Sequence, residues 1–329
     1  MKAIVYTQYG SADRLHVQEV AKPAPQDNQV LIKVHAVAIN AADLHLLNGQ
    51  PFLIRMMGFG LLKPKNTVLG ADIAGRVEAV GGSVKQFRPG DEVFGDLSGC
   101  GMGGFAEYVL APENALVLKP SRLSFEETAA VPMAAATALQ ALREKGHIQA
   151  GQKVLINGAS GGVGTFAVQL AKSFGAEVTA VCSSGNVDRM RSIGADHVID
   201  YTKEDFARNG QQYDLIIAAN GDRSISDYAR ALSQNGTYVM VGGSTRQMFQ
   251  AMLLGPLMSM KSHKKMVSLM AKTTTQHLEF LKGPLEAGKV VPVIDRCYSL
   301  REGVDAVHYL EQGHAKGKVV ISMGQNGHA

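Results

Sequence analysis

Cysteine is scarce in this chain, and its few positions lie far apart. Only three cysteines occur among 329 residues, at Cys100, Cys182 and Cys297. They are odd in number and match neither a CxxC metal spacing nor a disulfide framework. The first residues are typical of a β-strand rather than of a signal peptide. We therefore expect a reducing, cytoplasmic location.

Charge is also sparse and nearly balanced. Charged residues make up 19% of the sequence, and the formal net charge is only +4. No basic block interleaved with aromatic residues occurs, and this argues against a nucleic-acid partner.

Apolar runs long enough to cross a membrane are lacking as well. The nearest run, residues 249–260, is interrupted by Gly255 and Pro256 and is followed by lysines. Three interpretations of this run stay open: a pocket lid, a subunit contact, and a helix on a membrane surface. We expect no stable membrane insertion.

The most informative stretch is a run of small residues at 157–164, Asn-Gly-Ala-Ser-Gly-Gly-Val-Gly. It follows an apolar strand at 153–156 and opens an amphipathic helix, the context in which such a run binds a dinucleotide. Small residues permit a tight turn and let N–H groups at the helix N-terminus approach a pyrophosphate. The predicted cofactor-binding residues of this loop are Ala159, Ser160, Gly161, Gly162, Val163 and Gly164.

Strand and turn signals change along the chain. Residues 1 to about 120 are rich in short strands separated by glycine and proline turns. From about 124, helices alternate with apolar strands, which predicts a parallel sheet with helices on both faces. The predicted fold class is therefore α/β, with a β-rich domain followed by a doubly wound Rossmann domain.

The order of several short motifs resembles the medium-chain dehydrogenase/reductases, in their zinc-independent quinone oxidoreductase branch. The motifs are Asn40-Ala41-Ala42-Asp43, Val68–Gly75, Phe87–Val93, Gly104–Tyr108, the glycine loop, Gly194–Tyr201 and Gly317–Val320. The resemblance implies a GroES-like catalytic and substrate domain at 1–123, joined by 291–329, and a Rossmann NADP-binding domain at 124–290. It also implies a homodimer.

The resemblance places the zinc-ligand positions of related alcohol dehydrogenases on residues that bind zinc poorly. These positions hold Asn40, Ala71 and Met133: an amide, a methyl and a thioether. The cysteine cluster of a structural zinc is also missing, since only Cys100 lies in that region. We therefore predict no metal site.

Four polar residues are catalytic candidates by the same resemblance. Asn40 could bind substrate or nicotinamide, or it could tie down its own loop. Asp43 is as much a structural hydrogen-bond acceptor as a catalytic group, because the family keeps an acid here. His45 could donate a proton or be a solvated side chain. Thr137 matches a threonine beside the nicotinamide, the alternative being a hydroxyl bonded within its helix.

The end of the second Rossmann strand predicts NADPH as the cofactor. NAD enzymes commonly place an acid there to bind the ribose 2′-hydroxyl, and none is present at that position. Ser183 and Ser184 could instead donate to a 2′-phosphate, and Arg189 could pair with it or be a solvated helix residue. Tyr201 resembles the tyrosine that packs near the adenosine phosphate. Loops after the fourth and fifth strands should border the cofactor, at Asn220, Gly242 and Gly243.

These observations predict a zinc-independent oxidoreductase that transfers hydride from NADPH to a quinone or an α,β-unsaturated carbonyl, an enal or enone. Such acceptors disperse the incoming charge themselves, so they need mainly orientation and a proton. Two alternatives stay open. One is a zinc-less alcohol dehydrogenase-like enzyme, and the other is an NADPH-binding scaffold protein, since a Rossmann motif predicts binding and not turnover.

Overall fold

The computed structural model describes residues 1–52, 54–261 and 263–324, and these fall into two compact units. Unit 1 is formed by the described parts of Met1–Met133, Thr273–Glu286 and Pro292–Ala329, and unit 2 by those of Ala134–Lys272 and Ala287–Val291. Compared with the boundaries expected at 123/124 and 290/291, residues 124–133 and 273–286 group with unit 1.

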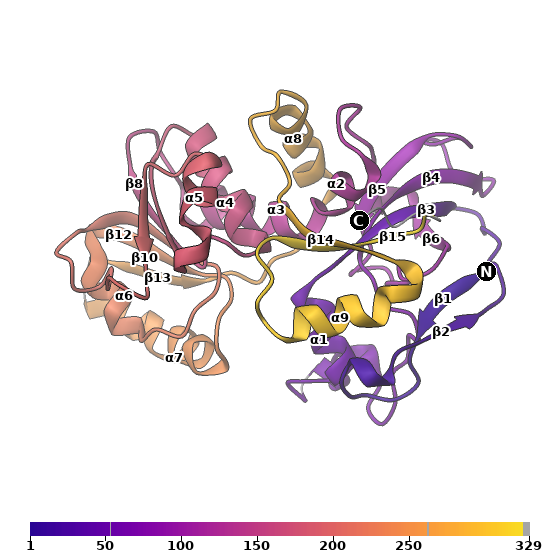
Figure 1. Cartoon of the computed structure of the whole chain (residues 1–329), viewed down its shortest axis with the longest axis horizontal. Coiled ribbons are helices and arrows are strands. Elements are labelled where there is room, and N and C mark those ends of the chain that lie inside the picture. Colours follow the sequence, from indigo (N-terminus) through magenta and orange to yellow (C-terminus); the bar gives the residue numbers. More distant parts are fainter. Residues whose placement is uncertain (53, 262, 325–329) are drawn as a thin grey trace. The chain divides into compact units, whose positions relative to one another are not determined.

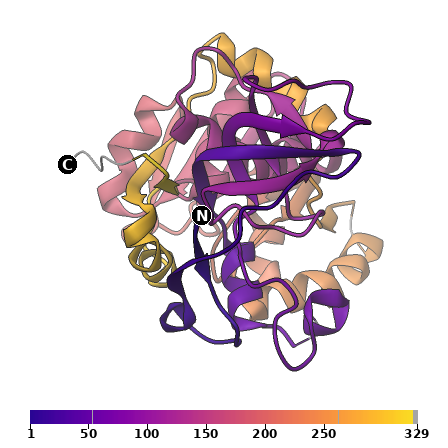
Figure 2. The same ribbon diagram turned by 90° about the vertical axis from the view of Figure 1, so that its right-hand side faces the viewer.

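A seven-stranded sheet forms the centre of unit 1. Its strands are β3 (Gln29–Ile39), β4 (Asp72–Val80), β5 (Glu92–Asp96), β6 (Tyr108–Pro112), β7 (Leu116–Leu118), β14 (Ile294–Ser299) and β15 (Lys318–Ser322). The order is β14-β15-β3-β4-β5-β7, with β6 paired to β3. Figure 2 shows these strands side by side. A separate antiparallel pair joins β1 (Lys2–Val5) to β2 (His16–Glu19).

The last strand ties the C-terminal segment into unit 1. β15 runs antiparallel to β3, with Val319 opposite Ile39 and Ile321 opposite Val37. All four side chains are buried in the core of this unit. The helices of the unit are α1 (Ala41–Asn48), α2 (Phe125–Ala129), α8 (Thr275–Glu286) and α9 (Gly303–Glu311), with short helical turns at Ala12–Arg14, Arg55–Phe59, Glu113–Ala115 and Leu300–Glu302.

Unit 2 is a six-stranded parallel sheet with helices on both faces, as the sequence predicts (Figure 1). Its strands are β8 (Lys153–Asn157), β9 (Glu177–Cys182), β10 (His197–Asp200), β11 (Tyr213–Ala218), β12 (Leu232–Met240) and β13 (Lys265–Ser268). Its helices are α4 (Gly162–Ser173), α5 (Val187–Ser192), α6 (Ile225–Ala231) and α7 (Thr245–Lys261), with helical turns at Gln140–Lys145 and Ser184–Asn186; α3 (Pro132–Leu139) starts at the division between the units.

The strand order of unit 2 creates a switch point between β8 and β11. The order is β10-β9-β8-β11-β12-β13, so the chain leaves β8 in one direction and continues from β11 in the other. Right-handed crossovers then place α4 and α5 on one face of the sheet and α6 and α7 on the other. Ligands of such sheets bind beyond the carboxyl ends of the strands at this point.

Two further features concern whether the chain crosses or contacts a membrane. No helix in the described ranges combines the length and the hydropathy that a bilayer crossing needs. The apolar run at 249–260 forms most of α7, where Phe249, Met252 and Leu253 are exposed and Ala251 is buried. The role of this run stays a prediction.

Candidate functional site

The carboxyl ends of the unit-2 strands bring most of the predicted cofactor residues to one edge of the sheet. Asn157 at the end of β8 pairs in register with Val181 of β9 and with Ala218 of β11. Asp200 at the end of β10 lies opposite Cys182. The residues that follow these ends therefore meet at this edge, and they are Ala159, Ser160, Gly161, Gly162, Val163, Gly164, Ser183, Ser184, Tyr201, Asn220, Gly242 and Gly243.

The glycine loop forms a tight turn into α4. Gly158 adopts a left-handed conformation with φ of +78°. A Cβ on Gly164 would lie 2.2 Å from the carbonyl oxygen of Gly158, so only glycine lets the helix pack this closely on the turn. The first N–H groups of an α-helix lack intrahelical partners, and at α4 they can bind a pyrophosphate. The geometry of the loop therefore fits a dinucleotide.

A buried polar cluster fixes the neighbouring loops from beneath. The Asn157 side-chain amide donates to the Tyr228 hydroxyl at 2.7 Å and to the carbonyl of Asn220 at 3.0 Å. The Gln247 amide oxygen accepts from the backbone N–H of Arg223 at 3.1 Å. Sequence reasoning missed this cluster, although the polar Asn157 after the apolar strand Val154–Ile156 is a signal for it. These contacts orient the loops that border the predicted cofactor site.

A carboxylate lies beside Ser184, although no acidic residue stands directly at the end of β9. The Ser184 hydroxyl donates to Asp200 Oδ2 at 2.6 Å, and the Thr202 hydroxyl donates to Asp200 Oδ1 at 2.7 Å. Lys203 Nζ is 3.3 Å from the same carboxylate. These donors hold the pKa of Asp200 well below its usual range. Sequence reasoning missed Asp200 as a neighbour of Ser184, because it comes from the third strand.

Two other predicted cofactor residues lie nearby in the chain. Ser183 accepts a hydrogen bond from the side-chain amide of Asn186 at 2.9 Å. Arg189 is half-buried in α5. Their roles toward a cofactor stay predictions.

In unit 1 the side chain of Asn40 is held by buried neighbours. Its Oδ1 accepts from Lys318 Nζ at 2.5 Å. Its Nδ2 donates to Asp72 Oδ2 at 3.0 Å and to the carbonyl of Ala38 at 3.4 Å. Because both ends of the amide have partners within unit 1, these contacts favour the loop-tying interpretation over direct substrate binding.

Asp43 acts as a hydrogen-bond acceptor at the start of α1. Its carboxylate accepts from the backbone N–H of Asn40 at 2.8 Å and from that of Gly70 at 3.0 Å. Burial raises the pKa of Asp43 to about 6, although these two hydrogen bonds oppose the rise. The contacts favour the structural alternative for this residue.

A buried ion pair lies beside the positions that the resemblance assigns to zinc ligands. Lys318 Nζ lies 3.6 Å from Asp72 Oδ2, and the two side chains are 4% and 0% exposed. Asp72 also accepts from the backbone N–H of Met133 at 3.0 Å and follows Ala71 in the chain. Burial raises the pKa of Asp72 and lowers that of Lys318, and each partner's charge opposes the shift. Asn40 and the Met133 backbone thus contact an internal ammonium–carboxylate pair, and Ala71 precedes its carboxylate in the chain.

The other two catalytic candidates differ in exposure and belong to different units. His45 is exposed on α1, and its Nδ1 is 3.1 Å from the carbonyl oxygen of Gln50. Thr137 lies in α3, within unit 2, and is 6% exposed. Across the described ranges, no group of three or more His, Cys, Asp or Glu side chains is arranged to hold a metal ion.

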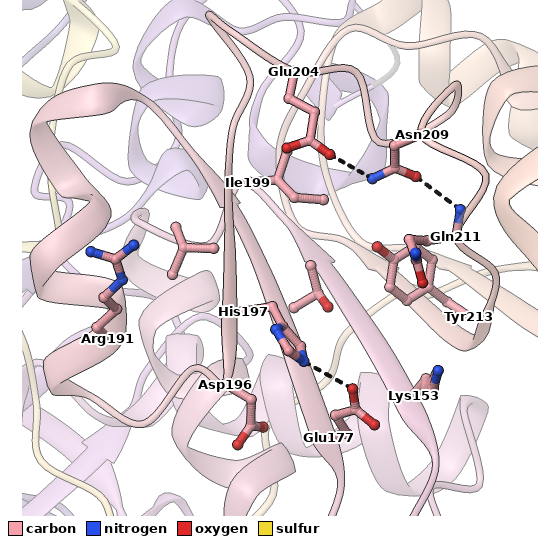
Figure 3. A pocket seen from close by; sticks show the side chains of 12 residues that line it. Lys153, Glu177, Arg191, Asp196, His197, Ile199, Glu204, Asn209, Gln211 and Tyr213 are labelled. Carbon is pink, nitrogen blue, oxygen red and sulfur yellow. Dashed lines mark hydrogen bonds and ion pairs between the residues drawn. The ribbon is translucent and has the colours of Figure 1, made fainter.

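A pocket of about 440 Å³ opens at the amino ends of the unit-2 strands, opposite the predicted cofactor site (Figure 3). Its lining includes Lys153, Glu177, His197 and Tyr213, the first residues of four adjacent strands. The His197 ring and Glu177 interact at 2.9 Å. Since parallel sheets bind cofactors at their carboxyl edge, this pocket is distinct from the predicted cofactor site.

Comparisons with known proteins place the chain in a family. An alcohol dehydrogenase GroES-like domain model matches residues 26–121, and a zinc-binding dehydrogenase domain model matches residues 193–321. The chain is 36% identical to the chloroplastic quinone-oxidoreductase QR1 of Triphysaria versicolor, over 98% of each protein. It is 33% identical to the NADPH-dependent alkenal/one oxidoreductase of Arabidopsis thaliana, over 98% of this chain and 79% of that protein.

A solved structure supports the same conclusion. The quinone oxidoreductase from Coxiella burnetii superposes with a TM-score of 0.86 at 31% identity, covering 98% of this chain and 99% of that one. The chain belongs to the medium-chain dehydrogenase/reductase superfamily, with a GroES-like domain and a Rossmann domain, and its relatives include quinone oxidoreductases.

Proposed function

We propose that the protein is a zinc-independent oxidoreductase that transfers hydride from NADPH to a quinone, an enal or an enone. The observation that carries this proposal is a glycine loop whose geometry fits a dinucleotide, in a chain that holds Asn40, Ala71 and Met133 where the resemblance implies zinc ligands. Zinc would polarise the carbonyl of a simple ketone, and the residues at these three positions are not zinc donors. Acceptors that disperse the incoming charge themselves are therefore favoured.

The residues at the carboxyl edge of unit 2 fit a nicotinamide cofactor. The turn at Gly158 and the first N–H groups of α4 would hold the pyrophosphate, since the Gly164 position has no room for a side chain. Tyr201, exposed at 55%, would lie by the adenosine, and Asn220, Gly242 and Gly243 would border the nicotinamide half. When bound, NADPH supplies the hydride. Its choice over NADH is supported by the NADPH-dependent relative.

The remaining side chains would orient the substrate and deliver a proton. Thr137 would lie by the nicotinamide, as its counterpart does in the family. His45 would donate a proton or a hydrogen bond to the oxygen that gains charge, since it is the exposed titratable candidate. Asn40 and Asp43 would act as positioning residues that hold the start of α1.

A substrate panel tests this function. Purified protein is given NADPH with a set of quinones, enals and enones, and with NADP and primary alcohols in the reverse direction. We expect turnover of the first group and negligible alcohol oxidation. Faster alcohol oxidation would favour the alcohol dehydrogenase-like alternative, and tight NADPH binding without any turnover would favour the scaffold alternative.

Assembly and location are further proposals. A homodimer is supported by the family relationship, and size-exclusion chromatography with light scattering would measure it. A cytoplasmic location is supported by the scarcity of cysteine, although the relatives named above include chloroplastic proteins. Imaging of the tagged protein in its own cells would test this location.

A further inference from the structure

We infer that Lys203, on the turn after β10, is the cation that recognises the 2′-phosphate of the cofactor. Its ammonium lies 3.3 Å from Asp200, a carboxylate that also accepts from Ser184. This inference rests on the proposed NADPH dependence. Lys203 is not among the cofactor-binding residues predicted from the sequence. The cation predicted there is Arg189.

The position of Lys203 follows from the sheet register. The ends of β9 and β10 lie opposite each other, with Cys182 paired to Asp200. The backbone N–H of Tyr201 donates to the carbonyl of Cys182 at 3.0 Å, which pins the turn after β10 against the end of β9. The ribose 2′ position of a bound dinucleotide lies beyond the end of the second strand, which is β9 here. Lys203 therefore lies at the carboxyl ends of the strands, just after β10, which is the neighbour of β9.

Asp200 does not favour NADH in the way that an acid at the end of β9 would. Its carboxylate has about four lone-pair sites. It accepts hydrogen bonds from the Ser184 hydroxyl, from the Thr202 hydroxyl and from the Thr202 backbone N–H. Lys203 Nζ lies 3.3 Å from the same group. The acceptor capacity is thus already used, so little remains for a ribose 2′-hydroxyl.

Lys203, by contrast, keeps capacity for a ligand. Its side chain is 74% exposed, whereas that of Asp200 is 11% exposed. An ammonium carries three donor hydrogens, and one contact with Asp200 leaves others for a phosphate. The charge of Lys203 offsets that of Asp200, so a phosphate approaching this edge meets a cation before it meets the carboxylate.

Two neighbouring groups complete the recognition surface. Ser184 is exposed, and its hydroxyl can rotate to donate to a phosphate. The Asp200 carboxylate then keeps three of its four contacts, two from Thr202 and one from Lys203. Tyr201, 55% exposed, offers a flat ring to the adenine beside it. The surface therefore combines a cation, a hydroxyl and an aromatic face, as an adenosine 2′-phosphate requires.

The test compares Lys203→Gln with a matched control on the same segment. Arg208 is also exposed and forms an i,i+3 ion pair, with Asp205, just as Lys203 does with Asp200. Isothermal titration calorimetry on the full-length protein would measure the dissociation constants of NADPH, NADH and 2′,5′-ADP. We expect Lys203→Gln to weaken NADPH and 2′,5′-ADP by about tenfold or more and to leave NADH unchanged, since one charge-assisted contact is lost. Arg208→Gln should change none of them by more than about twofold.

The other outcomes separate the inference from the function on which it rests. If the wild type prefers NADPH but Lys203→Gln keeps that preference, the inference is wrong and the proposed function stands. If Arg189→Ala loses the preference for NADPH over NADH and Lys203→Gln keeps it, Arg189 is the residue that binds the 2′-phosphate. If the wild type binds NADPH and NADH equally, the proposed NADPH dependence itself fails.

Discussion

The buried pair of Asp72 and Lys318 gives a stability prediction that can be worked out from the structure. The charged atoms are 3.6 Å apart, and the side chains are 0% and 4% exposed. At an effective dielectric constant of about 20, two unit charges at this distance attract by about 4–5 kcal/mol. Lys318→Met removes this attraction and strands a buried carboxylate. We therefore expect the free energy of unfolding to fall by about 3–5 kcal/mol.

A double-mutant cycle isolates the contribution of the pair. Asp72→Asn in the Lys318→Met background removes the stranded charge, so the double variant should be more stable than Lys318→Met alone. Denaturant-induced unfolding at pH 7, followed by circular dichroism, would compare the four proteins. Losses that simply add would refute the reasoning, because they would show that the two side chains are not coupled.

A surface pair serves as the control. Lys22 Nζ lies 2.7 Å from Glu78 Oε1, closer than the atoms of the buried pair, but both side chains are 41% exposed. Solvent screens such a pair, so Lys22→Met should leave stability close to that of the wild type. A loss as large as that of Lys318→Met would show that distance, and not burial, sets the effect.

Three further predictions concern the sites. Burial raises the pKa of Asp43 to about 6, above its unfolded value, so this group favours folding at low pH and that contribution is lost as pH rises from about 4 to 6. The free energy of unfolding, measured across this pH range, should show the loss in the wild type and not in Asp43→Asn. Parallel pH profiles of the two proteins would contradict this prediction. Gly164→Ala should weaken cofactor binding by more than about tenfold in a titration, because the new Cβ meets the Gly158 carbonyl at 2.2 Å. Gly283→Ala, where a Cβ meets open space, is the control, and equal affinities would contradict the loop assignment. Elemental analysis should find no stoichiometric zinc, and a chelator should leave turnover unchanged; tightly held zinc would show that the ligand positions are misassigned.

Local patterns were sufficient to predict the Rossmann sheet. The apolar run Val154–Ile156 is continuous because both faces of β8 are covered, and small residues between such a strand and a helix are typical of a dinucleotide-binding turn. Both signals lie within about ten residues of the chain, so they need no knowledge of distant contacts.

The domain boundary was harder to predict, because it depends on packing. The change of pattern near residue 124 marks the first helix of a new run. However, α2 packs on β3 and β4 of unit 1, and its capping box between Ser124 and Glu127 is local to the helix. A helix signal gives the secondary structure of a segment and leaves open the sheet on which it packs.

The partners of the site residues were the least predictable part. Asn40 meets Lys318 only because β15 pairs with β3, across 278 positions of sequence. Asp200 reaches Ser184 only because β9 and β10 are in register. In both cases the sequence shows the residue types, and the sheet register decides which of them meet.

Steady-state oxidation of NADPH, measured with protein whose zinc content is known, tests the central proposal most directly. The rate would be measured with quinones, enals and enones, and alcohol oxidation with NADP would be measured on the same preparation. We predict that zinc-free protein reduces at least one of these acceptor classes and oxidises simple primary alcohols negligibly. Activity that needs added zinc, or alcohol oxidation that outpaces every acceptor, would contradict the proposed function.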